Sequence, residues 1–367
     1  MRRNASLLLM ISIWILSGCG MMPTPVASAT PVIANLPVAA TATGAKVPTP
    51  LCPNPDCVFV TPAYRRPEAL HFDLPTPGDE LVSAWRPPQY TVPLALGQFD
   101  HFYFARPIAA NEINWPLADY RYGGTFVSKD ITHTGVDIAA KTGTPVLAAG
   151  PGTVIWAGWG LFSSSPGNLS DPYGMAVAIR HDFGYEGQQL YTIYAHMSAV
   201  DVTVGQWVAT NTLLGKVGDT GNTTGPHLHF EVRLGKNSYY NTRNPELWLA
   251  PAQGWGVLAG RVMGDNAKLS NSQPIVIDAV GRTQQWIVNT YGPGAAIHDS
   301  YYDENMVISD LPAGDYIVTV ITYAVAHKLK VTIIPGHVTF FSYQNVKGFS
   351  NTPPPPPSFS IPTPPNK

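Results

Sequence analysis

The residues best suited to chemistry form three short groups in the middle of this 367-residue chain. The first group holds His133 and Asp137, four positions apart. His196 ends the second group, and the third is the pair His227 and His229. Imidazole and carboxylate groups are ligands that Zn²⁺ accepts, and a catalytic zinc keeps three protein ligands and one open position. These five side chains are two more than the metal needs as ligands. The two additional imidazoles would suit proton transfer during hydrolysis.

The third group is expected on a β-strand that presents both histidines on one face. Side chains two positions apart on a strand point the same way, so His227, His229 and Glu231 would look outward together. Leu228 and Phe230 would then face the core. The glycine-rich run before this strand lacks the Gly-Lys-Ser/Thr ending of a phosphate-binding loop, and it is expected at the rim of a groove.

The first two groups are also expected beside strands. Glycine and β-branched neighbours of the His-x3-Asp segment favour a turn that leads into a strand rather than a helix. In the run that ends at His196, alternation would place Thr192, Tyr194 and His196 on one face. Ile193 and Ala195 would take the opposite face.

The composition favours strands over helices throughout the chain. Its 36 prolines and 33 glycines interrupt helices, and 45% of its residues are hydrophobic, which is enough for a core. Short β-branched runs separated by turns predict an antiparallel sheet from about 100 to 250 and a smaller β unit after it. The predicted strands of the sheet are 145–149, 152–157, 175–180, 190–196 and 227–233. Those of the second unit are 257–262, 274–280, 285–289, 315–321, 328–334 and 338–343, with a turn at 310–315.

The three groups together resemble the signature of peptidase family M23, the LytM/lysostaphin-type zinc endopeptidases. The segments His-Thr-Gly-Val-Asp, Tyr-Ala-His and His-Leu-His-Phe-Glu occur in the order that the family has. The resemblance covers about residues 115–250 and implies an antiparallel M23-type peptidase core. One departure is the stretch 160–172, which is longer than the family's usual turn and is expected to lengthen a wall of the groove.

The resemblance also implies the roles of single residues and the substrate. His133, Asp137 and His229 would bind one Zn²⁺ ion. His196 and His227 would be the catalytic pair, and the sequence leaves open which of them is the base. The substrate implied is a peptide bond of peptidoglycan, in a stem or a cross-bridge.

Two other functions stay open at this point. One is a non-catalytic LytM-type domain that binds the wall or activates other wall hydrolases. Domains of this non-catalytic kind typically lack one or more of the metal or catalytic positions. The other is a wall-binding adhesin whose metal site is vestigial. The sequence also leaves undecided whether a regulatory protein partner is needed to open the groove.

The N-terminus indicates export and a lipid anchor. Arg2 and Arg3 precede a short apolar run ending in Leu-Ser-Gly-Cys, which resembles a bacterial lipobox with Cys19 as the lipidated residue. The protein is then expected outside the cytoplasm, anchored to the cell membrane or to a diderm's outer membrane. An ordinary secretory signal with a chance Cys is the alternative. Cys52 and Cys57 are expected to form a disulfide, because a two-Cys metal site would have no partner ligands nearby.

These features predict a mainly β chain in five segments. The segments are a signal peptide at 1–18, a Pro/Thr/Ala-rich tether at 19–95, an M23-type domain at 96–252, a small β-sandwich at 256–349 and a Pro-rich tail at 350–367. The β-sandwich resembles the carboxypeptidase regulatory-like (transthyretin-like) domain in its turn, strand pattern and length.

Charge and motifs exclude several other classes of protein. A net charge of −2 without any basic block disfavours nucleic-acid binding. The chain has no Gly-x-Ser-x-Gly motif and its three cysteines have non-catalytic assignments, so serine and cysteine hydrolases are disfavoured. The other histidines are expected to be structural: His71, His101, His181, His298, His327 and His337.

Overall fold

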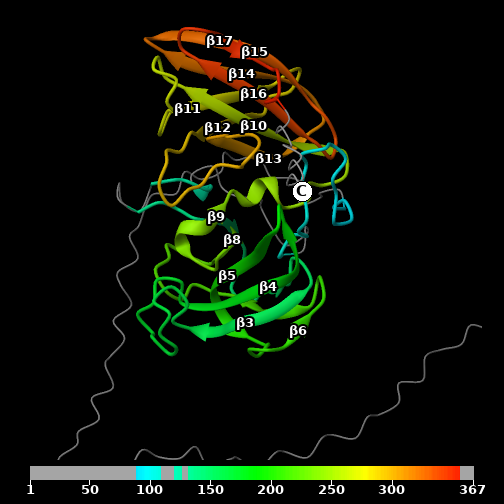
Figure 1. Ribbon diagram of the computed structural model, residues 1–367, viewed down its shortest axis with the longest axis vertical. Helices are drawn as coiled ribbons and strands as arrows, with labels where there is room; N and C mark the ends of the chain where they lie inside the picture. Colours follow the sequence, from blue (N-terminus) through cyan, green and yellow to red (C-terminus); the bar gives the residue numbers. More distant parts are fainter. Residues whose placement is uncertain (1–87, 109–119, 126–130, 356–367) are drawn as a thin grey trace, which may run out of the picture. The chain divides into compact units, whose positions relative to one another are not determined.

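A computed structural model describes residues 88–108, 120–125 and 131–355, and these residues belong to one compact unit. Nearly all of their regular structure is β (Figure 1), so the prediction of a mainly β chain is confirmed. Among these residues no helix has the length and apolar character needed to cross a bilayer. The predicted signal peptide, the lipidated Cys19 and the Cys52 and Cys57 disulfide lie outside the described residues.

The first half of the described chain forms a nine-stranded antiparallel sheet, as its short β-branched runs predict. The strands are β1 (Val136–Ala139), β2 (Pro145–Leu147), β3 (Gly152–Trp159), β4 (Met175–Tyr185), β5 (Gln188–Val200), β6 (Trp207–Val208), β7 (Leu213–Val217), β8 (His227–Leu234) and β9 (Thr242–Arg243). The main path runs β1-β8-β5-β4-β3-β6, so β8 and β5 lie together in its interior (Figure 1). Two 3-10 turns, η2 (Tyr239–Asn241) and η3 (Pro245–Leu247), flank β9.

Alternation along β8 determines which of its side chains face the core. Leu228, Phe230 and Val232 are fully buried in the main hydrophobic cluster, two of them as predicted. Tyr194 of β5 packs against Phe230 with ring centroids 5.4 Å apart. Full burial of one such side chain contributes about 2 kcal/mol, and a one-residue slip would turn the whole set outward. The same packing therefore directs the alternate residues of β8, including its histidines, to the opposite face.

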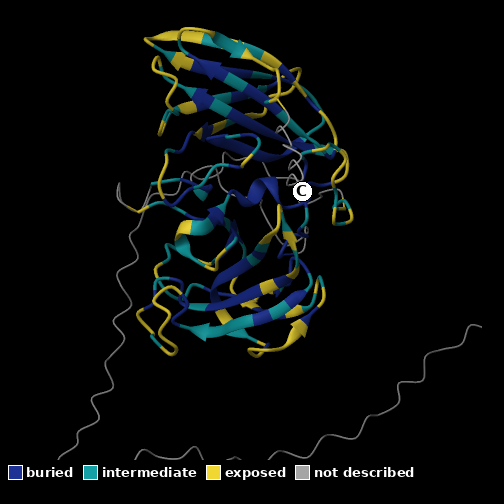
Figure 2. Ribbon diagram, in the orientation of Figure 1, coloured by how far each residue is buried: buried dark blue, intermediate teal, exposed yellow. Residues whose placement is uncertain are grey.

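Residues 255–350, here called the C-terminal module, form two four-stranded sheets. Their strands are β10 (Trp255–Met263), β11 (Pro274–Ala279), β12 (Gln285–Asn289), β13 (Met306–Pro312), β14 (Gly314–Thr322), β15 (Val325–Ile333), β16 (Val338–Gln344) and β17 (Gly348–Ser350). The sheet orders are β13-β10-β16-β17 and β12-β11-β14-β15. Both sheets contribute to one buried core, and Figure 2 shows buried residues along their strands. The pairing of β10 with β16 is parallel, which the sequence did not predict.

The predicted turn at 310–315 is wrong for most of its length. Residues 310–312 belong to β13, and only Ala313 separates this strand from β14 in the other sheet. Asp310 adopts a left-handed φ of 61°, and the pairing of β10 with β13 shifts register between Gly256 and Leu258. The turn-forming composition therefore marks an irregular strand end at the crossing between two sheets, not a wide loop.

The C-terminal module shares its packing with the nine-stranded sheet. The main hydrophobic cluster contains Val257, Tyr302 and Phe340 of the module beside residues of β4, β5 and β8. Arg106 forms a buried ion pair with Asp310. The two sheet systems therefore share one hydrophobic cluster, and a buried ion pair joins the segment before the first sheet to the module.

His181 of β4 is structural, as the sequence suggests, and it predicts an acid-sensitive fold. It is buried, with Nδ1 donating to the Pro151 carbonyl at 3.0 Å and Nε2 lying 2.8 Å from the Thr192 hydroxyl. Burial lowers the pKa of His181 to about 4. The unfolded chain, with a histidine pKa near 6.5, takes up the proton first. Stability therefore falls as the pH falls from about 6.5 to about 4, by up to about 3 kcal/mol from this residue.

Urea denaturation at pH 7 and pH 4.5 measures this effect. We expect the wild type to lose more free energy of unfolding between the two pH values than His181→Asn loses. Equal losses in the two proteins would show that His181 does not contribute to acid sensitivity.

Candidate metal centre

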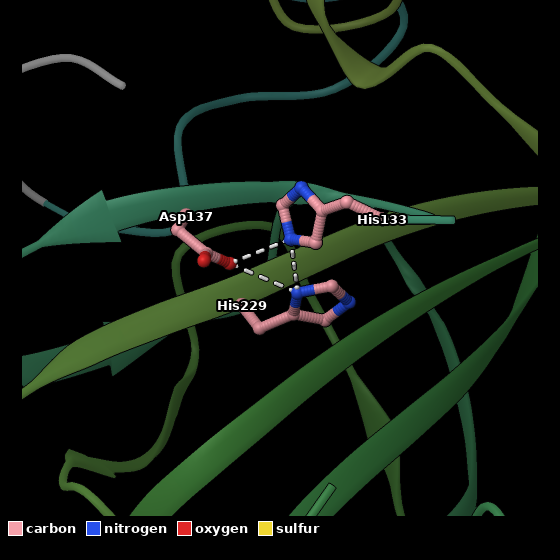
Figure 3. A group of neighbouring side chains, drawn as sticks. All are labelled: His133, Asp137 and His229. Atoms are coloured by element: carbon pink, nitrogen blue, oxygen red, sulfur yellow. Dashed lines mark hydrogen bonds and ion pairs between the residues drawn. The ribbon is translucent and has the colours of Figure 1, made fainter. Parts of the chain in front are cut away.

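Three side chains from two chain segments point their donor atoms at one small space (Figure 3). His133 Nε2 lies 3.0 Å from Asp137 Oδ1 and 3.0 Å from His229 Nδ1. His229 Nδ1 lies 2.9 Å from Asp137 Oδ1. A tetrahedral ion with bonds of about 2.0 Å needs donor atoms about 3.3 Å apart. Shifts of a few tenths of an ångström would therefore let the three atoms bind one ion and leave its fourth position open.

Strand register brings two of these groups together. Strands β1 and β8 pair antiparallel with Asp137 directly opposite His229. Residues opposite each other on neighbouring strands place their side chains on the same face, with Cβ atoms about 5 Å apart. His133 lies just before β1, and its position completes the triangle. The strand predicted after this segment is confirmed as β1.

Neighbouring groups decide which ring nitrogens face the centre. His133 Nδ1 donates to the Arg121 carbonyl at 3.0 Å, and His229 Nε2 donates to Glu231 Oε1 at 3.0 Å. Each ring therefore uses one N–H for an outer hydrogen bond and directs its other nitrogen toward the centre. Partners of this kind orient metal-binding histidines and raise their basicity. The donor set thus consists of two imidazole nitrogens and a carboxylate oxygen, which fits a divalent cation.

The pKa shifts of Asp137 and His229 show that the centre favours a positive charge. Although burial opposes its charge, His133, His227 and His229 hold the pKa of Asp137 well below its usual value. Burial also opposes a charge on His229, but Asp137 and Glu231 raise its pKa to about 9. The acidic neighbours of His229 therefore favour positive charge in the centre, which suits a metal cation.

His196 and His227 lie beside the three donors and are not needed to complete them. Their ring centroids are 4.8 Å apart, and His227 Nε2 lies 3.5 Å from Asp137 Oδ2. His196 Nδ1 donates to the Thr220 carbonyl and His227 Nδ1 to the Gly225 carbonyl, both at 2.8 Å. His196 therefore keeps Nε2 available for a substrate, and Nε2 of His227 faces the metal centre beside Asp137.

The environment of His196 keeps that residue neutral. Burial, together with the neighbouring His227 and His229, holds the pKa of His196 well below its usual value. A neutral imidazole whose Nδ1 carries the proton has a lone pair on Nε2. His196 is therefore able to accept a proton at that atom.

The predicted facing of His196 is wrong. Alternation would place it beside Tyr194, whose ring packs in the core against Phe230. Instead the ring of His196 lies 5.7 Å from the ring of His229. His229 pairs with Ala195 across the strands, so His196 shares the face of Ala195 and not that of Tyr194. His196 has a left-handed φ of 62°, and the register of β5 shifts on both sides of it. This backbone irregularity turns the side chain from the core face to the metal face.

Glu231 joins the centre to a buried hydrogen-bond network that the sequence only partly indicated. Its Oε1 accepts from the Thr134 and Tyr173 hydroxyls, both at 2.5 Å, and its Oε2 accepts from Arg233 at 2.6 Å. Although burial opposes ionisation, Arg233 and His229 hold the pKa of Glu231 below its usual value. Arg233 continues the two-residue alternation of the histidines in β8, so that signal could have found it. Tyr173 follows an irregular loop, where no periodic pattern exists.

The long stretch 160–172 folds around one buried carboxylate. Asp171 accepts from the backbone N–H groups of Phe162 and Ser163, at 3.2 and 2.8 Å. The Phe162 ring meets Tyr173 and Tyr239 edge-on, at 5.4 and 5.5 Å. The stretch thus places an aromatic side chain next to Tyr173, whose ring stacks on His229 at 5.6 Å.

Comparison with known families agrees with this geometry. The sequence profile described as Peptidase family M23 matches residues 131–242. The chain contains a peptidase family M23 domain. All three donors of the metal centre, and His196 and His227 with them, lie inside the residues that match.

The M23 domain is similar to segments of several curated proteins. It is 42% identical over 102 residues to DD-carboxypeptidase/endopeptidase Mpg of Neisseria meningitidis, covering 28% of this chain and 20% of that protein. Lysostaphin of Staphylococcus staphylolyticus is 32% identical over 130 residues, 35% of this chain and 24% of lysostaphin. Peptidoglycan DD-endopeptidase ShyA of Vibrio cholerae is 37% identical over 101 residues, 27% of this chain and 20% of ShyA. The matches thus span a fifth to a quarter of these relatives' length.

Proposed function

We propose that the M23 domain is a zinc endopeptidase that hydrolyses peptide bonds in the stems or cross-bridges of peptidoglycan. The observation that carries the proposal is the convergence of His133, Asp137 and His229 within 3.0 Å, with two further imidazoles left over beside them. Two nitrogen donors, one oxygen donor and an open position are typical of catalytic zinc. The similarity to the DD-carboxypeptidase/endopeptidase Mpg and to the peptidoglycan DD-endopeptidase ShyA supports the substrate class.

The roles of the residues follow from their available atoms. Zinc, when bound, would supply the Lewis acidity that polarises a carbonyl and makes a water nucleophilic near neutral pH. Neutral His196 would accept a proton at Nε2. His227 would use its Nε2 to donate a hydrogen bond to the developing oxyanion. One such donor contributes on the order of 3 kcal/mol to transition-state stabilisation.

Digestion of purified peptidoglycan tests this proposal. We expect the folded, zinc-loaded wild type to release fragments with new peptide ends, identified by mass spectrometry. His227→Ala should retain one zinc ion and cleave at least about 100-fold more slowly, because one hydrogen-bond donor to the oxyanion contributes about 10²–10³-fold. His327→Ala, on strand β15 of the C-terminal module, is the matched control and should cleave like the wild type.

Two outcomes would contradict the proposal. The zinc-loaded wild type could release no new peptide ends, which would favour a non-catalytic LytM-type domain that binds the wall or activates other hydrolases. Alternatively, His227→Ala could cleave at the wild-type rate, in which case the bond is broken by other groups.

We further propose that the peptidase works at the cell envelope, attached by lipid at Cys19. The support is the lipobox-like sequence at the N-terminus. The protein expressed in bacteria should partition into the detergent phase of Triton X-114, because acyl chains bury many CH₂ groups at about 0.8 kcal/mol each. Cys19→Ser should move to the aqueous phase. Equal partitioning of the two proteins would remove the lipid anchor from the account.

A further inference from the structure

The metal-binding His133 is held on its outer side by a short segment, residues 121–124. The ring Nδ1 donates to the Arg121 carbonyl at 3.0 Å. The backbone adds two bonds, from Gly123 N to His133 O at 2.7 Å and from His133 N to Gly124 O at 2.8 Å. The position and the tautomer of this histidine therefore depend on where residues 121–124 lie.

The segment 121–124 is itself covered by the C-terminal module. A Cβ placed on Gly123 would lie 2.3 Å from the Cβ of Tyr291, so the two residues are in direct contact. The Tyr122 ring meets the Tyr291 ring edge-on at 5.3 Å, and both rings are buried. The Tyr122 hydroxyl accepts from Ile297 N at 2.7 Å. Tyr291 and Ile297 belong to residues 290–305, the loop between β12 and β13.

Arg121 ties the same segment to the module a second time. Its guanidinium forms an ion pair with Glu246, which is fully buried. The Oε2 of Glu246 also accepts from the backbone N–H and the hydroxyl of Ser309, at 2.7 and 2.8 Å. Ser309 is in β13 of the C-terminal module, so the carbonyl that orients His133 belongs to a residue fixed from the module side.

We propose that the C-terminal module positions the metal centre, with Tyr291 as a positioning residue that acts on His133 through residues 121–124. The inference rests on the metal site of the proposed function and deepens it. The module is then part of the structure that shapes the peptidase site, in addition to any ligand it binds. Removing the contact should loosen the His133 ring and weaken zinc binding, as loss of an outer partner of a metal-binding histidine does.

The test measures zinc affinity of the full chain by competition with a chelator. We expect Tyr291→Ala to bind zinc about 10- to 100-fold more weakly than the wild type. Tyr291→Phe keeps the ring on Gly123 and loses the hydroxyl bonds to Glu304, at 2.5 Å, and to Asn244, so its affinity should stay close to wild type. Absorption of the cobalt-substituted proteins should show altered coordination in Tyr291→Ala alone.

Tyr316→Ala is the matched control for general damage to the module. Tyr316 is as buried as Tyr291 but lies in β14, in the core between the two sheets. We expect Tyr316→Ala to bind zinc with wild-type affinity and to keep the wild-type cobalt spectrum. An equal loss of affinity in Tyr316→Ala and Tyr291→Ala would overturn the proposal, because the loss of zinc affinity would then result from loosening of the whole module.

Tyr122→Phe keeps the test decisive if Tyr291→Ala does not fold. This variant retains the ring contact with Tyr291 but loses the hydroxyl bonds to Ile297 and to Thr242, so zinc affinity should fall at least about fivefold, the size expected for one lost hydrogen bond. Wild-type zinc affinity in Tyr122→Phe, and in Tyr291→Ala where it folds, would overturn the proposal. Absence of peptidoglycan cleavage with these affinity differences intact would contradict only the proposed function.

Discussion

Asp137→Ala will bind zinc at least about 100-fold more weakly than the wild type while keeping the fold. The expected size follows from zinc-site binding energies of about 10–16 kcal/mol, shared among three or four ligands. Asp137 supplies the only carboxylate among the three donors, and its Oδ1 lies 2.9–3.0 Å from both partner nitrogens. Isothermal titration of the metal-free protein with zinc measures the change.

His196→Ala is the control that separates metal binding from catalysis. The His196 ring bonds to the Thr220 carbonyl and is not one of the three converging donors. We expect this variant to bind one zinc ion like the wild type and to lose peptidoglycan cleavage. If Asp137→Ala retained full zinc affinity, or if His196→Ala lost it, the division between metal ligands and proton-transfer residues would be wrong.

Glu246→Ala will lower the free energy of unfolding by about 3–5 kcal/mol. The carboxylate is fully buried and is the ion-pair partner of Arg121, and it also accepts two hydrogen bonds from Ser309. Truncation leaves a buried guanidinium and a buried N–H without their acceptor, which is the costly way to break an internal ion pair. Urea denaturation followed by circular dichroism gives the change.

Lys330→Ala is the matched control for this effect. Lys330 pairs with Asp315 at 2.7 Å, but its side chain is 60% exposed. Exposed pairs are weak because water screens the charges, so the denaturation midpoint should not move. A loss in Glu246→Ala no larger than that in Lys330→Ala would show that the buried ion pair does not stabilise the contact between the sheet and the module.

Much of the centre could be predicted because it follows from local periodicity. The facing of His227, His229 and Glu231 needs only the two-residue repeat of a strand whose other side chains are apolar. The spacing of His133 and Asp137 likewise needs only a turn that leads into a strand. Regular backbone and a strongly apolar opposite face make such predictions robust.

The parts that could not be predicted depend on irregular backbone or on contacts distant in sequence. His196 reaches the metal face because of one left-handed residue, and no pattern of side chains reveals such a φ. Arg121 bonds to His133, and Tyr291 contacts residues 122–123 from a distant segment of the chain. The sequence around these two residues therefore contains no pattern that predicts their role. The strand β13 was missed because its turn-forming residues mark a crossing between sheets.

X-ray absorption at the zinc edge tests the central claim most directly, namely that His133, Asp137 and His229 bind one ion. The zinc-loaded protein should contain one zinc per chain, with nitrogen and oxygen neighbours at about 2.0–2.1 Å and the outer scattering of two imidazole rings. A shell of sulfur atoms at about 2.3 Å, or a hydrated ion without imidazole scattering, would contradict the account.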